Sequence, residues 1–176
     1  MRFPLCLRSA ISMCALAPAL MLAAGATSAH DGIETKLKGY QEVPAVSTTA
    51  TGRFKARVDE KSASISYELS YQGLQGEVRQ AHVHLAQRGV NGGIMVWLCQ
   101  SSINVDPTGL SPVCPQSGSV GGLLQAANVI GPAGQGIDAT EFAELVAAIR
   151  AGAAYVNVHT SKFPGGELRG QLRDDD

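Results

Sequence analysis

GRFKARVDEKSASISYELSY, residues Gly52 to Tyr71, alternates apolar and polar side chains in two runs that meet at a short polar connection. Side chains of a β-strand point alternately to the two faces of a sheet, so each run is typical of a strand with one buried and one wet face. The connection, Asp59–Lys61, is short enough to join the two runs as an antiparallel hairpin. This stretch therefore predicts an antiparallel β-protein.

The rest of the chain extends the same pattern. The other segments predicted as strands are residues 33–38, 79–86, 94–99, 154–160 and 167–172, with 123–130 ambiguous between strand and loop. Residues 41–46 should be extended, because the residue before a proline avoids the helical region. Residues 100–122 are rich in Ser, Pro and Gly, and we expect a long loop there.

A single helix is expected near residues 139–150. Apolar residues recur in it at helical spacing, Asp138 can cap its start, and Gly152 follows its end. About eight short strands and one short α-helix predict an all-β fold, an antiparallel Greek-key-like β-sandwich or a partly closed barrel.

The N-terminus has the features of a secretory signal peptide. Arg2 and Arg8 precede an apolar run over residues 11–24, and small residues then allow cleavage after Ala26 or Ala29. The run is short for a membrane span. We therefore expect a signal peptide over residues 1–29, one domain over 33–172 and an acidic tail over 173–176. The location should be periplasmic or secreted, without membrane insertion once the signal is removed.

Charge and cysteine content agree with export. Removing Arg2 and Arg8 leaves 12 of the 14 basic residues against 15 acidic ones, a net charge of 12 − 15 = −3. With no basic stripe, nucleic acid is a poor partner. Cys99 and Cys114 remain as an even pair, which favours a disulfide in an oxidising compartment over a thiolate metal site or a redox pair.

Three of the four histidines form the most informative pattern. His82 and His84 lie two residues apart on one predicted strand, and His159 lies on another. Positions i and i+2 share a face, so all three occupy the polar face of their strands, away from the core. Imidazole is a common ligand of zinc and copper, and zinc sites often use three protein ligands. A mononuclear copper or zinc site is therefore predicted if the two strands are neighbours.

Two residues are further candidate ligands. Glu167 could supply a carboxylate from the last strand, and His30 would become a chelating N-terminus if cleavage follows Ala29. In the competing interpretation the histidines are solvated and idle, or they belong to a structural polar network with Asn157 and Arg169. Trp97 is expected in the apolar core.

Five motifs, in this order, resemble the CHRD (chordin-type) domain family. They are LKGYQEVP (37–44), ATG (50–52), AHVH (81–84), GAAYVNVHT (152–160) and PGGELRGQL (164–172). The resemblance spans the predicted domain and implies an all-β sandwich in an exported, bacterial-type protein. It implies little chemistry, and the growth-factor binding associated with chordin does not transfer to a lone domain.

A weaker similarity links Gly73-Leu74 and His82-Val83-His84 to the copper strand of copper–zinc superoxide dismutases. No histidine lies between Leu85 and Val158, so the binuclear site of those enzymes cannot be assembled. No nucleophile motif is present. We therefore expect an exported binding module with one copper or zinc ion, rather than an enzyme. The alternatives are a metal-free structural or protein-interaction domain with an unknown partner, and a mononuclear copper enzyme that handles superoxide.

Overall fold

The computed structural model describes residues 32–173; the predicted signal peptide, His30 and residues 174–176 of the acidic tail lie outside them. The strands are β1 (Gly32–Lys38), β2 (Thr51–Asp59), β3 (Ser64–Gln72), β4 (Val78–Leu85), β5 (Ile94–Cys99), β6 (Gly118–Leu124), β7 (Ala154–Thr160) and β8 (Leu168–Gln171). The helix α1 spans Phe142–Arg150, and 3-10 turns cover Gly39–Gln41, Ala126–Asn128 and Ala133–Gln135.

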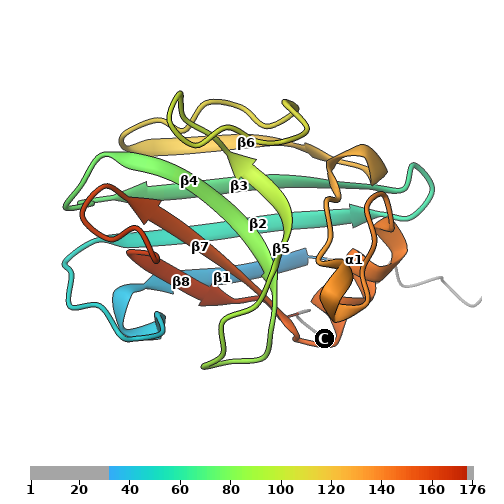
Figure 1. Ribbon diagram of the computed structural model, residues 1–176, viewed down its shortest axis with the longest axis horizontal. Helices are drawn as coiled ribbons and strands as arrows, with labels where there is room; N and C mark the ends of the chain where they lie inside the picture. The colour runs from blue at the N-terminus through green and yellow to red at the C-terminus, as the bar shows by residue number, and fades with distance from the viewer. Residues whose placement is uncertain (1–31, 174–176) are drawn as a thin grey trace, which may run out of the picture.

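All eight strands belong to one antiparallel sheet. Their order is β5-β4-β7-β8-β1-β2-β3-β6, and the sheet curls until its outer strands, β5 and β6, contact each other. In Figure 1 β4, β5 and β7 pass in front of β2 and β3, with α1 at one end. The predicted all-β class with one short helix is confirmed, and the strands form a single near-barrel sheet rather than two separate ones.

The hairpin that decided the fold class forms as expected. Phe54 on β2 lies opposite Leu69 on β3, and both are buried against the core inside the barrel. Fully burying a side chain of this size contributes about 1.5–3 kcal/mol relative to leaving it exposed. The same core takes residues from every strand and from α1.

Two boundaries differ from the sequence prediction. β6 begins at Gly118, inside the stretch predicted as loop, because its glycines hide the alternation and most of its residues are exposed. α1 begins at Phe142, because Glu141 is its N-cap and the Glu141 carboxylate accepts the Asp138 backbone N–H at 2.7 Å instead of Asp138 capping the helix. Residues 41–46 form no strand.

The outer face of one half of the sheet is covered by loops. Every residue of β7 and β8 is buried, although alternate side chains point away from the core. The covering segments are residues 39–46, 87–93 and 161–166, which make hydrogen bonds to side chains of this face. The polar face predicted by strand parity is therefore a second, enclosed layer.

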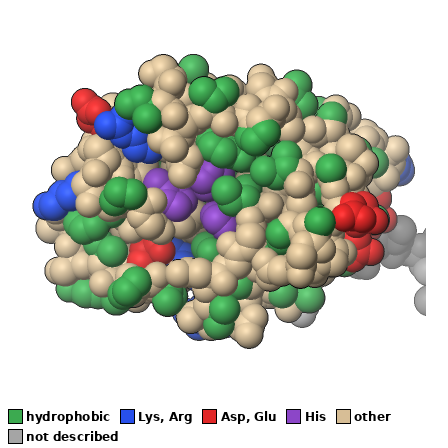
Figure 2. Space-filling model, in the orientation of Figure 1, with side chains coloured by type: hydrophobic (Ala, Val, Ile, Leu, Met, Phe, Trp, Pro, Cys, Tyr) green, Lys and Arg blue, Asp and Glu red, His purple; other side chains and the backbone are tan. Residues whose placement is uncertain are grey.

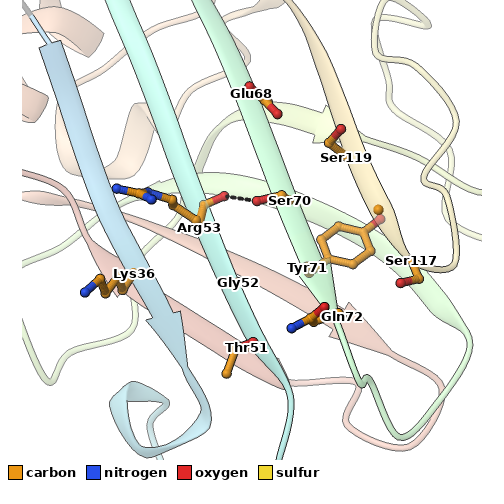
Figure 3. A pocket seen from close by; sticks show the side chains of 11 residues that line it. Lys36, Thr51, Gly52, Arg53, Glu68, Ser70, Tyr71, Gln72, Ser117 and Ser119 are labelled. Atoms are coloured by element: carbon orange, nitrogen blue, oxygen red, sulfur yellow. Dashed lines mark hydrogen bonds between the residues drawn. The ribbon is translucent and has the colours of Figure 1, made fainter.

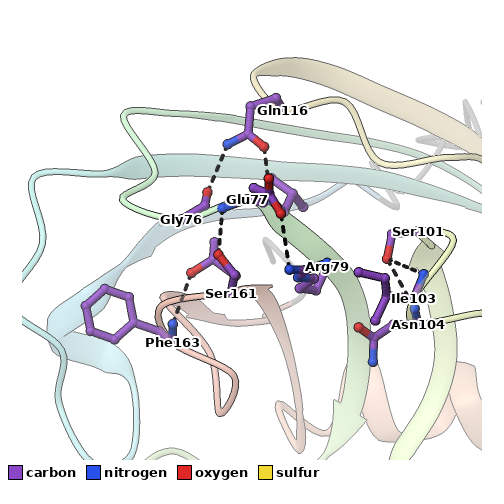
Figure 4. A network of polar contacts seen from close by, with 11 residues as sticks. Gly76, Glu77, Arg79, Ser101, Ile103, Asn104, Gln116, Ser161 and Phe163 are labelled. Atoms are coloured by element: carbon purple, nitrogen blue, oxygen red, sulfur yellow. Dashed lines mark hydrogen bonds and ion pairs between the residues drawn. The ribbon is translucent and has the colours of Figure 1, made fainter.

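Cross-links hold the loops around this layer in place. The predicted disulfide between Cys99 and Cys114 is present, with the two Cα atoms 4.9 Å apart, and it anchors the long loop after β5. The Gln116 side chain of that loop donates to Gly76 O at 2.9 Å, and the Ser161 hydroxyl accepts from Glu77 N at 3.0 Å (Figure 4). These bonds join the turn before β4 to the long loop after β5 and to the turn after β7.

A separate depression lies over the outer surface of β1, β2, β3 and β6 (Figure 3). Its lining includes Lys36, Arg53, Glu68 and Ser70, and Arg53 is already paired with Glu34. It contains no histidine. Within residues 32–173, no helix is long and apolar enough to cross a membrane.

Candidate metal centre

Strand pairing brings the three predicted ligands together. β4 and β7 are antiparallel neighbours, with His82 opposite Asn157 and Gln80 opposite His159. One ring nitrogen each from His82, His84 and His159 can be chosen so that all lie within 4.8 Å of one another. Figure 2 shows the described histidines gathered in one place on this face.

The three histidines are almost fully enclosed. His82 is 0% exposed, whereas His84 and His159 are each 7% exposed. The solvated pair of the competing interpretation is therefore wrong, since the loops over the sheet enclose the cluster. The remaining exposure of His84 and His159 places these two rings at the edge of the enclosed layer.

Backbone carbonyls fix the tautomers of two rings. The Nδ1 atoms of His84 and His159 lie 2.9 Å from Gly92 O and 2.8 Å from Pro164 O. A carbonyl oxygen only accepts, so each Nδ1 carries the proton and each Nε2 presents a lone pair. Histidines that ligate metals are held in this way, with the second ring nitrogen donating to a fixed acceptor.

The free ring nitrogens have few partners. The Nε2 atoms of both His82 and His84 are buried without a hydrogen-bond partner. His82 Nδ1 lies 3.3 Å from His159 Nε2. Two ligands at about 2.05 Å from a tetrahedral zinc ion are separated by about 3.3 Å, so this pair is spaced as two ligands of one ion.

Burial keeps all three imidazoles neutral. It lowers the pKa of His82 to about 2, with further lowering by His159 and His84. Burial also lowers the pKa of His84, to about 4, against the hydrogen bond to Gly92. The pKa of His159 is lowered for the same reason, against the bond to Pro164. A neutral imidazole is the form that binds metal, so the ligands need no deprotonation at pH 7.

A stack of side chains supports His84. Its ring lies parallel to that of Tyr155, at 4.8 Å between centroids, and the Arg169 guanidinium lies over the Tyr155 ring at 3.4 Å from its centroid. Arg169 also donates to Val90 O at 2.7 Å and to Asn91 Oδ1 at 3.0 Å. Arg169 thus holds the loop whose Gly92 carbonyl orients His84.

Two members of the site were not expected. Trp97 lies opposite His82 on β5, with ring centroids 4.3 Å apart and its indole nitrogen buried without a partner. It was predicted in the core, but irregular pairing between β4 and β5 brings it to the histidine layer. Glu42 is 5% exposed, and one carboxylate oxygen has no partner. Burial raises the pKa of Glu42 to about 7, partly offset by Arg169.

Glu167 is placed elsewhere. Its carboxylate accepts from the hydroxyls of Thr48 at 2.8 Å and Thr160 at 2.9 Å, and from Gln75 N at 2.9 Å. It lies outside the histidine cluster. Its hydrogen bonds link the segments that carry Thr48, Gln75 and Thr160. The remaining candidate ligand, His30, lies outside the described residues.

Comparisons with known proteins identify the domain family but say nothing about its chemistry. A family model described as CHRD domain matches residues 33–172. No curated protein and no solved structure matches significantly.

Proposed function

Since this chain belongs to the CHRD domain family, a family of β-domains, we propose that it is an exported binding module that holds one copper or zinc ion through His82, His84 and His159. The observation that carries this proposal is the pair of Nε2 lone pairs on His84 and His159, each fixed by a backbone carbonyl at the opposite nitrogen.

The chemistry of the cluster supports an ion rather than a structural network. A structural network satisfies its buried polar atoms, because an unsatisfied one costs about 1–3 kcal/mol. Here the Nε2 atom of His84, whose Nδ1 donates to Gly92 O, faces no partner within the protein. Three neutral nitrogen donors suit zinc or copper, whereas calcium and magnesium prefer oxygen.

Equilibrium dialysis of metal-stripped protein against zinc or copper, followed by elemental analysis, tests the proposal. We expect one ion per chain in the parent and a large loss of affinity in the His82→Ala/His84→Ala double variant. Gln80→Ala, on the same strand, is the matched control and should bind as the parent does. A double variant that binds both metals as tightly as the parent would overturn the proposal.

The export half of the proposal rests on the N-terminal sequence and on the Cys99–Cys114 disulfide, since disulfides persist in oxidising compartments. N-terminal sequencing of the protein recovered outside the cytoplasm tests it. A chain starting at Thr27 or His30 supports cleavage after Ala26 or Ala29. Recovery only in the cytoplasm with Met1 retained would contradict it.

A further inference from the structure

The side chain of Asn157 lies at the centre of the histidine cluster with its oxygen turned inward. Asn157 Oδ1 is 2.9 Å from His159 Nε2, and its amide also contacts His84. His159 Nδ1 already donates its proton to Pro164 O, so Nε2 presents a lone pair to an oxygen that can only accept. The alternative tautomer would only move the conflict to Pro164 O. Neutral His159 therefore has one acceptor, Asn157 Oδ1, facing another at 2.9 Å, while His82 Nδ1, at 3.3 Å, is left as the donor to Nε2.

The orientation of Asn157 is set from the other side. Its amide nitrogen lies next to the Glu42 carboxylate, and interaction with Asn157 lowers the pKa of Glu42. Above its pKa of about 7 the Glu42 carboxylate is ionised and only accepts, so it then selects Nδ2 and directs Oδ1 to the histidines. Gly166 makes room for this contact, because a Cβ there would collide with the Glu42 carboxylate and lie 2.9 Å from Asn157 Nδ2.

We infer that Asn157 Oδ1 is the fourth protein ligand of the ion, and that Glu42 positions it by holding the amide. This inference rests on the proposed function, which supplies the three histidines. A cation between His159 Nε2 and Asn157 Oδ1 removes the conflict between the two acceptors. Ligands of one tetrahedral zinc ion are about 3.3 Å apart, so the 2.9 Å between these two atoms has to widen by about 0.4 Å when the ion binds.

A fourth oxygen ligand changes the ion that the site favours. Three imidazoles alone suit both monovalent and divalent copper, whereas a carbonyl oxygen is a hard ligand. The set of three nitrogens and one oxygen favours a divalent ion, zinc or cupric copper, over cuprous copper. Above its pKa of about 7, Glu42 adds a negative charge beside Asn157, which acts in the same direction.

Zinc affinity of metal-stripped variants tests the inference. Asn157→Leu should weaken zinc binding on the order of 10-fold or more, as even outer partners of metal ligands do, while Asn157→Asp should keep or strengthen it. Gln171→Met is the control, because Gln171 is a buried amide on β8 that bonds to Ala86 O and Gly152 O rather than to a histidine. A parent that binds zinc, with Asn157→Leu binding equally well, would overturn the inference and leave the proposed function standing.

A crystal structure of the zinc-loaded parent protein gives a second test that needs no variant. The inference expects Asn157 Oδ1 at about 2.0–2.2 Å from the ion. An ion held by the three histidines, with the amide nitrogen of Asn157 turned toward them, would overturn it. A parent that binds no zinc or copper would instead reject the proposed function itself.

Discussion

Acidification should destabilise the metal-free protein, because folding buries histidines that are protonated readily in the unfolded chain. The pKa of His82 falls from 6.5 to about 2 and that of His84 to about 4. Between those values and 6.5 the unfolded chain binds more protons than the folded one, so stability falls as the pH falls. From pH 7 to pH 5, each of these histidines should lower the free energy of unfolding by about 2 kcal/mol. The slope is about 1.4 kcal/mol per pH unit below pH 6.5.

Glu42 works in the opposite direction. Its pKa rises from 4.5 to about 7 on folding, so the folded state binds the extra proton between those values and gains stability as the pH falls. Between pH 7 and pH 5 this gain offsets about 2 kcal/mol of the stability lost through the histidines. The two histidines together lose about 4 kcal/mol over the same range, so about 2 kcal/mol of net loss remains. His159, whose pKa is also lowered, adds to the loss with the same sign.

The assay is urea unfolding at pH 7 and pH 5 with a chelator present, followed by fluorescence. Trp97 is the single tryptophan of the chain and is buried beside His82, so it reports loss of this region directly. The His84→Asn variant keeps a donor for Gly92 O, but the asparagine cannot be protonated. Between pH 7 and pH 5 this variant should therefore lose about 2 kcal/mol less stability than the parent. Equal stability of the parent at both pH values, or the same pH dependence in His84→Asn, would refute the reasoning.

Two further predictions concern the supports of the site. Gly166→Ala should weaken zinc binding on the order of 10-fold, because the new Cβ collides with the Glu42 carboxylate and because residue 166 has a φ of +126°. Gly165→Ala is the control in the same zinc titration and should bind zinc normally, because its Cβ meets nothing within 4 Å. Replacing Cys99 and Cys114 by serine should cost about 3 kcal/mol in urea unfolding, from a closed loop of 15 residues, and change zinc affinity little; a stability equal to that of the parent would contradict this.

The sequence predicted the histidine cluster because strand parity is a local property. His82, His84 and His159 could be assigned to one type of face from spacing alone, and the pairing of β4 with β7 then joined them. Local patterns could not show that loops cover this face. The bare alternation of buried and polar residues is the same for an enclosed polar layer and for a wetted surface.

The supporting residues depend on long-range geometry. Glu42 reaches the site from a 3-10 turn more than a hundred residues before Asn157, and no spacing rule connects the two. Trp97 was misplaced because the irregular pairing of β4 and β5 cannot be read from a continuous apolar run. The pairing of Cys99 with Cys114 was predictable, since only one even pair follows the signal segment.

The location of the bound ion tests the central claim most directly. Crystals of the parent protein loaded with zinc or copper, measured at the absorption edge of the metal, should show one anomalous peak per chain. We predict that it lies about 2.0–2.1 Å from one ring nitrogen each of His82, His84 and His159. Loaded crystals with no peak at the three histidines, or with the ion bound only at other residues, would contradict the claim.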